Sequence, residues 1–222
     1  MKKRVLIGMS GGIDSSVAAY MLLQSGYEVE GITLRLWGDS GEEEKDWKSR
    51  SCCKIGIARY VAERIGIKHS VLDISDKFRD EIIGQFLAEY TLGRTPNPCV
   101  RCNERIKFGL LLDLARENGF DHLATGHYAR IEHKGNGQYL LKKGVDETKD
   151  QGYFLYRLKQ DQLRDILFPL GAITKKEVFK IAEECLALPV DEIRESQEIC
   201  FVTQKDYRDF VIGEIPQAAI PG

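Results

Sequence analysis

Three cysteines stand in settings that could do chemistry. Cys99 and Cys102 have C-x-x-C spacing in RTPNPCVRCN, residues 94–103, and Cys200 lies in SQEICF, residues 196–201. Thiols at this spacing can hold a metal, cycle through a disulfide or supply a nucleophile beside a helper. The cysteines alone leave these three chemistries open, so the choice depends on what else the chain carries.

A second motif, SGGIDSS at residues 10–16, follows the apolar run VLIGM and precedes a helical pattern. Gly11 and Gly12 let the backbone turn tightly and approach a phosphate, and the N–H groups of a helix N-terminus attract anions. Ser10, Ser15 and Ser16 add hydroxyls, and Asp14 is a candidate helix cap or Mg²⁺ ligand. The motif is neither a Walker loop nor a dinucleotide fingerprint, because the lysine of the first and the G-x-G-x-x-G of the second are absent. A plain strand-to-helix turn is the alternative.

Alternating strand and helix patterns fill the first part of the chain. Such alternation is typical of a doubly wound α/β fold with a mostly parallel sheet, in which ligands bind beyond the carboxyl ends of the strands. The patterns predict strands at 3–9, 27–37, 68–74 and 121–127 and helices at 15–26, 55–66, 76–93 and 103–119. Beyond residue 130 they predict a hairpin around 137–144, a helix at 174–188 and a short strand at 198–203.

Composition describes an ordinary globular chain. The 222 residues are 43% hydrophobic and 30% charged, with a net charge of −2, which argues against coating nucleic acid by bulk charge. No apolar run reaches the roughly 18 residues of a membrane span, and the N-terminal run is too short for a signal peptide. We therefore expect a cytoplasmic protein whose six cysteines are not structural disulfides.

The loop SGG-x-DS-S resembles the pyrophosphate loop of the ATP pyrophosphatases (PP-loop enzymes), which cleave ATP between the α- and β-phosphates and adenylate a carbonyl oxygen. Taken with GRTPNPCVRCN, ATGHYAR, KDQGYFLYRL and SQEICF in this order, the chain resembles the tRNA-uridine 2-thiolases (MnmA-type thiouridylases) from Val5 to about Gly222. The resemblance implies the fold of the adenine-nucleotide α-hydrolase type, the cofactors ATP and Mg²⁺, and tRNA and a sulfur donor as partners. The oligomeric state stays unknown, with a dimer as one option.

The resemblance also implies roles for individual residues. The nucleotide would lie against Gly8, Met9, Ser10, Gly11, Gly12, Ile13, Asp14, Ser15, Ser16, Leu34 and Gly126. The target base and the tRNA would lie against Asn97, Pro98, His127, Lys149, Asp150 and Gln151. Cys102 and Cys200 would be the catalytic cysteines, with Cys200 carrying a persulfide.

Cys99 departs from the commonest family pattern, which has Asp at this position. Three cysteines, Cys99, Cys102 and Cys200, are the number that holds a [4Fe–4S] cluster with one iron open, and we predict such a cluster as sulfur carrier. A persulfide relay between Cys200 and Cys102, with Cys99 catalytically silent, is the first alternative, and a zinc site is the second.

Other residues carry weaker expectations. Arg94, Arg101 and Arg105 surround the cysteine pair and are expected to lower its thiol pKa. Cys185 is predicted to be buried and inert. Cys52 and Cys53 are predicted to be surface or core fillers, with sulfur acceptance or a fourth metal ligand as the alternative. The aromatic residues of GYFLYRL are predicted to be core or a stacking surface for RNA bases.

The chemistry of uridine thiolation fits these residues, because a carbonyl oxygen must be activated before sulfur can displace it. We predict a catalytic domain at 1–205, with an irregular tRNA-facing part at about 131–205, and the start of an otherwise missing central domain at 206–222. The chain is then either part of a longer protein or a short natural form. Rival functions are an amide-forming synthetase of the same fold and a non-catalytic nucleotide- or RNA-binding domain.

Overall fold

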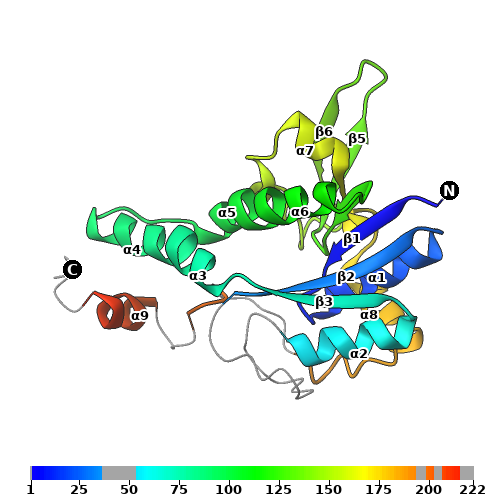
Figure 1. The fold of residues 1–222 in the computed structure, drawn as a ribbon, viewed down its shortest axis with the longest axis horizontal. Helices are drawn as coiled ribbons and strands as arrows, with labels where there is room; N and C mark the ends of the chain where they lie inside the picture. Colours follow the sequence, from blue (N-terminus) through cyan, green and yellow to red (C-terminus); the bar gives the residue numbers. More distant parts are fainter. Residues whose placement is uncertain (1, 37–53, 194–198, 203–206, 216–222) are drawn as a thin grey trace.

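The computed structural model describes residues 2–36, 54–193, 199–202 and 207–215. Its centre is a five-stranded parallel sheet in the order β3-β2-β1-β4-β7 (Figure 1). The strands are β1 (Arg4–Gly8), β2 (Glu28–Arg35), β3 (Lys68–Asp73), β4 (His122–Ala124) and β7 (Ile166–Leu167). The predicted doubly wound fold is confirmed, and four of these strands lie where the sequence predicts them.

Helices cover both faces of the sheet because β1 alternates its side chains. Val5 and Ile7 pack against α1 (Ile13–Gln24), α2 (Ile55–Ile65) and α8 (Lys175–Glu184) on one face. Leu6 packs against the helix that contains Leu111 and Ala115 on the other. Every β1 side chain in these two cores is at most 5% exposed, as a strand buried on both faces requires.

Two long helical runs lie on the second side of the sheet, and the first of them reaches toward α9 (Tyr207–Glu214) (Figure 1). Each contains a π-helical segment, a feature that often marks functional sites. The first run is α3 (Ser75–Phe78), η1 (Arg79–Ile83) and α4 (Gly84–Thr91), and the second is α5 (Pro98–Cys102), η2 (Asn103–Leu110) and α6 (Leu111–Glu117).

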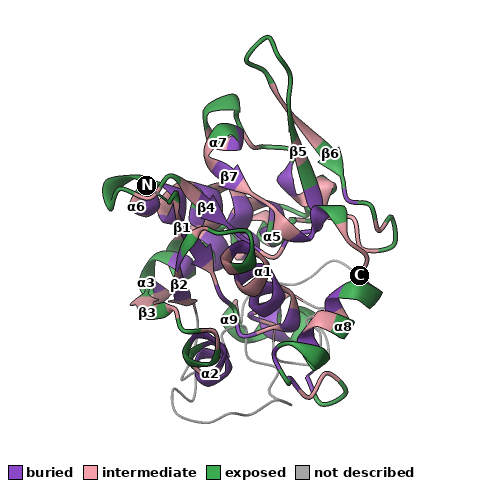
Figure 2. Ribbon diagram, turned by 90° about the vertical axis from the view of Figure 1, so that its right-hand side faces the viewer, coloured by how far each residue is buried: buried purple, intermediate pink, exposed green. Residues whose placement is uncertain are grey.

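The remaining elements flank the sheet. The predicted hairpin is confirmed and projects from the body as a largely exposed arm (Figure 2). Its strands are β5 (Ala129–His133) and β6 (Tyr139–Lys143), and the other elements are η3 (Gly152–Leu155), α7 (Gln160–Asp165), η4 (Pro169–Ala172) and α9 (Tyr207–Glu214).

The short strand predicted at 198–203 is wrong over the residues described there. Ile199–Val202 form a turn in which the Val202 N–H donates to the Ile199 carbonyl at 3.0 Å. The physical reason is Phe201, which is 1% exposed and inserts into an aromatic cluster with Phe86 and Phe210 at centroid distances of 5.2 and 5.4 Å. Packing, not strand pairing, fixes the segment that carries Cys200.

Cys185 is exposed, so its predicted burial is also wrong. The buried face of α8 is made by Val178 and Ala182, and the helix ends at Glu184. Cys185 directly follows the last residue of α8 and does not lie on its buried face.

We predict that Phe201→Ala lowers the free energy of unfolding by about 3–5 kcal/mol, because it empties a fully enclosed aromatic site. Chemical denaturation measures this change. Leu92→Ala, at a side chain 62% exposed, is the control and should cost less than about 0.5 kcal/mol. Equal losses in the two variants would contradict the packing role of Phe201.

Candidate active site

The phosphate loop lies between β1 and α1 and is held in place by its own serines. The Ser10 N–H donates to Ser15 Oγ at 3.2 Å, and the Gly12 N–H donates to Ser10 Oγ at 3.3 Å. Gly12 is the N-cap of α1 with extended dihedral angles, and no side chain caps the helix. The N-terminal N–H groups of α1 are therefore not blocked by a side-chain cap, as an anion-binding helix end requires.

Two glycines allow the close approaches that shape this loop. Gly11 has φ +76°, and a Cβ there would lie 2.2 Å from the Lys54 carbonyl oxygen. Gly126, after β4, lies so close to the loop that a Cβ would be 2.8 Å from the Ser15 nitrogen. Because β1 and β4 are neighbours, the loops after them meet at the carboxyl edge of the sheet, where doubly wound proteins bind ligands.

Lys175 is a basic residue at this site that the sequence did not reveal. Its Nζ donates to Asp14 Oδ1 at 2.7 Å, and the Tyr128 hydroxyl donates to the same oxygen at 2.6 Å. Lys175 is 7% exposed and also lies over the Phe179 ring at 4.8 Å. The capping box of Thr174 and Glu177 starts α8 and so positions Lys175, but only the tertiary fold brings it to the phosphate loop.

Asp14 is thus engaged by a cation and a hydroxyl. Its proposed role as Mg²⁺ ligand is untested and stays a prediction.

The cysteine pair is helical and not on a loop. Asn97 Oδ1 accepts from the Val100 N–H at 3.1 Å, and Pro98 occupies the first turn, so NPC begins α5 as a capped helix. Cys99 is exposed, whereas Cys102 is 8% exposed, three residues farther along.

One cavity of about 710 Å³ joins the phosphate loop to all three thiols. This volume is within the usual range for small-molecule sites. The residues of the sequence prediction that line it are Gly8, Met9, Ser10, Asp14, Ser15, Leu34, Asn97, Pro98, Cys99, Cys102, Gly126, His127, Gln151 and Cys200.

The other predicted residues lie outside the cavity wall. Gly11, Gly12, Ile13 and Ser16 belong to the loop and the first turn of α1, and Lys149 and Asp150 lie between β6 and η3. Asp150 Oδ1 accepts from the Gly144 N–H at 2.9 Å, which gives Asp150 a structural task there.

The two thiols of α5 are poor thiolates in this state. Burial raises the pKa of Cys102 to about 12. Cys99 is exposed as a residue, but it lines the cavity, where partial desolvation and the nearby Cys200 raise the pKa of its thiol. Lys107 is the cation that lowers both pKa values in part. Both thiols are therefore mainly protonated at neutral pH.

The three arginines expected to activate the thiols are engaged elsewhere. Each makes an ion pair with a glutamate: Arg94 with Glu89 at 3.0 Å, Arg101 with Glu104 at 3.7 Å, and Arg105 with Glu81 at 3.6 Å. The expectation is wrong because these glutamates compete for the arginine side chains, and Lys107 is the cation that lowers the thiol pKa values.

His127 lines the cavity, and its imidazole is neutral. Burial and Lys107 hold its pKa well below the ordinary range, and its Nδ1 lies 2.7 Å from Thr125 Oγ1. Its ring packs between Phe108 and Phe168, with both centroid distances at 5.8 Å or less. A neutral histidine here can donate or accept a hydrogen bond but brings no charge.

The predicted [4Fe–4S] cluster lacks support from the ligand geometry. Although three thiols line one cavity, no three Cys, His, Asp or Glu side chains among the described residues converge as metal ligands. The arrangement does not fit a cluster without movement. Cys52 and Cys53, the predicted fillers or acceptors, lie outside the described residues.

The aromatic stripe divides into two environments. Phe154 is half-buried and lines the cavity, but Tyr153 and Tyr156 are 67% and 63% exposed, so a core role is wrong for these tyrosines.

Among the described residues no helix is long and apolar enough to cross a membrane.

We predict that Gly126→Ala weakens ATP binding at least about 10-fold, because the new methyl group must displace the Ser15 N–H from its place. Isothermal titration calorimetry measures the affinity. Gly213→Ala is the matched control, since a Cβ there meets nothing within 4 Å. Unchanged affinity in Gly126→Ala would place the nucleotide elsewhere.

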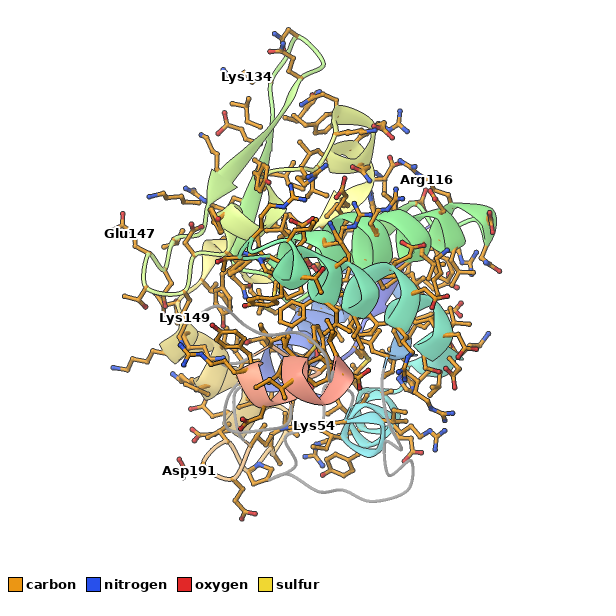
Figure 3. All side chains as sticks on the ribbon, turned by 90° about the vertical axis from the view of Figure 1, so that its left-hand side faces the viewer. Lys54, Arg116, Lys134, Glu147, Lys149 and Asp191 are labelled. Carbon is orange, nitrogen blue, oxygen red and sulfur yellow. The ribbon has the colours of Figure 1, made fainter. Side chains whose placement is uncertain are left out.

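We also predict that alkylation of Cys99 rises with pH around a midpoint above that of an ordinary thiol, since only the thiolate reacts. Lys107→Met should move the midpoint further up, because it removes the cation that lowers the pKa. Mass spectrometry of the Cys99 peptide across pH reads this out. Lys134→Met, at the distant hairpin tip (Figure 3), is the control, and a midpoint that falls in Lys107→Met would contradict the assignment.

Comparison with known proteins agrees with this geometry. Residues 3–204 match the model of the family described as the tRNA methyl transferase HUP domain. The fold resembles the "predicted subunit of tRNA methyltransferase" from Methanocaldococcus jannaschii, with a TM-score of 0.51 and 18% identity over 82% of this chain and 75% of that one. That likeness concerns the fold alone.

Two curated relatives are much more similar in sequence. The tRNA-specific 2-thiouridylase MnmA 1 of Caldanaerobacter subterraneus subsp. tengcongensis is 50% identical over 100% of this chain and 62% of its own length. That of Syntrophus aciditrophicus is 53% identical over 95% of this chain and 56% of its own length. The chain thus spans about three fifths of the length of these relatives. The resemblance expected from the motifs is confirmed, and the chain belongs to the family of the tRNA methyl transferase HUP domain.

Proposed function

We propose that this chain is the catalytic part of an ATP-dependent enzyme that replaces the C2 oxygen of a tRNA wobble uridine with sulfur. One observation carries the proposal: a phosphate-binding loop and three thiols line the same cavity. An amide-forming synthetase would need the loop but not the thiols. A domain that only binds nucleotide or RNA would not need the phosphate loop and the thiols in the same cavity.

The first step would use the phosphate loop. The uracil O2 attacks the α-phosphorus of ATP, the bond to the β-phosphate breaks, pyrophosphate leaves, and the N3 proton is released. The N–H groups of the loop and of α1 would steady the phosphate oxygens. Lys175 is positioned to add a positive charge, and Asp14, once it releases Lys175, could accept Mg²⁺.

The second step would use the thiols. A persulfide on Cys200 attacks C2 with its terminal sulfur, and AMP leaves with the former O2. The Cys102 thiolate then attacks the Cys200 sulfur, which breaks the S–S bond, leaves sulfur on C2 and forms a Cys102–Cys200 disulfide. An external thiol reductant must reduce this disulfide before the next turnover.

The high pKa of Cys102 suits this order of events. A protonated thiol does not attack the persulfide before the base is loaded, because only the thiolate is nucleophilic. Lys107, which favours the thiolate of Cys102, is the nearby charge able to support its later deprotonation.

We predict that Cys102→Ser and Cys200→Ser abolish thiolation of a tRNA transcript, whereas Cys99→Ser retains it. The readout is 2-thiouridine by mass spectrometry, with ATP and a persulfide donor supplied. Cys185→Ser, at an exposed site that directly follows α8 and lies outside the cavity, is the control and should be fully active.

Iron analysis of anaerobically purified protein separates this relay from cluster chemistry. The relay predicts activity without iron. About four iron and acid-labile sulfide per chain, lost together with thiolation in Cys99→Ser, would contradict the relay and establish the cluster. AMP formation with ammonia or an amine as acceptor, independent of all three cysteines, would instead favour the synthetase.

A further inference from the structure

Asn103 ends the motif RTPNPCVRCN and is a buried polar residue at the active site, but no role has been assigned to it so far. It follows Cys102 directly, begins the π-helical segment η2, lines the cavity and is 3% exposed. An uncharged amide in such a place normally satisfies all of its hydrogen-bonding atoms, because an orphaned one costs free energy.

Only one half of the amide is satisfied. Nδ2 donates to the Phe154 carbonyl oxygen at 3.2 Å, but Oδ1 is buried and accepts no hydrogen bond from the described residues. The orientation of the amide is fixed, because the reverse orientation would face Oδ1 with another acceptor, the Phe154 oxygen. The wall of the cavity therefore includes a buried acceptor that has no donor among the described residues, and a ligand reaches it only when the side chains around Oδ1 shift.

We propose that Asn103 Oδ1 accepts a hydrogen bond from N3–H of the target uracil and so selects uracil over cytosine. The inference rests on the proposed function. Uracil presents N3–H as its ring donor, whereas cytosine has an N3 lone pair that would face Oδ1 and repel it. Asn103 adjoins Cys102, and Phe154 also lines the cavity, so the amide lies on the thiol side where the base must bind.

The chemistry of the reaction sets where the hydrogen bond can act. Once O2 carries AMP, C2 and N3 share a double bond, because N1 is attached to ribose, and N3 bears no hydrogen. The hydrogen bond exists in the substrate and product complexes and not in the adenylated intermediate. Asn103 is therefore a residue for specificity and positioning, and its loss should raise KM more than it lowers kcat.

The test uses the protein with anticodon stem–loops that carry U or C at the target position. Wild type should bind the U form about 10- to 100-fold more tightly than the C form. Asn103→Ala should bring the two affinities to within about threefold, with ATP affinity unchanged and KM for the U form raised at nearly constant kcat. Asn103→Leu fills a similar space without an acceptor and should show the same loss of discrimination between U and C. It replaces Asn103→Ala in the test if the alanine variant does not fold.

Asn118→Ala is the matched control. Asn118 is exposed at the end of α6, and its Nδ2 donates to the Leu114 carbonyl at 2.8 Å. It should leave the discrimination between U and C unchanged.

Three outcomes overturn the proposal, and they can be told apart. Retained discrimination in both Asn103 variants overturns the base-reading role alone. Weakened ATP binding with discrimination intact assigns Asn103 to the adenine instead. A wild type that acts on no uridine RNA overturns the proposed function and this inference together.

Discussion

The structure depends on the parallel pairing of β1 with β2 on one side and β4 on the other. Parallel strands end at the same edge of a sheet, so the loops after β1 and β4 must meet. Their meeting is tight enough that glycine is needed on both sides, at Gly11 and at Gly126. This contact aims the N-terminus of α1 at the cavity and sets one boundary of the space where a nucleotide can lie.

The opposite boundary of the cavity is formed by helices that do not follow directly from the strand ends at the sheet edge. The run from α5 to α6 brings Cys99 and Cys102 to the cavity, while Phe201 anchors the turn that brings Cys200. Phe78, Phe86 and Phe210 form the other side of that anchor, so a packed aromatic cluster holds two thiol-bearing segments in one place. Burial there also raises the pKa of Cys102, which links the packing directly to the reactivity of the site.

Local sequence patterns predict the structure correctly where interactions between residues close in sequence determine it. The phosphate loop, the alternation of strands and helices and the hairpin all follow from spacing, glycines and apolar periodicity. They failed where distant contacts decide. Residues 198–203 have strand-like composition, but Phe201 packs in an aromatic core, and Arg105 pairs with Glu81 of the other helical run. Arg94 and Arg101 pair with glutamates close in sequence, Glu89 and Glu104, so for these two arginines a local ion pair decides.

The residues that sequence reasoning missed have the same explanation. Lys175 lies 161 positions from Asp14 along the chain, and only the placement of α8 makes them partners. The sequence predicts Asn103 only as part of a helix. That its Oδ1 lacks a hydrogen-bond donor becomes evident only from the side chains packed around it in the fold. The effect of Lys107 on the pKa of Cys102 likewise follows from their placement in the fold.

The central claim is that a shared cavity lets ATP activate the C2 oxygen of uridine before sulfur replaces it. The most direct test is to follow that oxygen, using an RNA labelled with ¹⁸O at C2 of the target uridine. The account predicts that one ¹⁸O appears in the phosphate of AMP for each uridine thiolated, as measured by mass spectrometry. Label that is released into water or remains in the RNA, while AMP carries none, would contradict it.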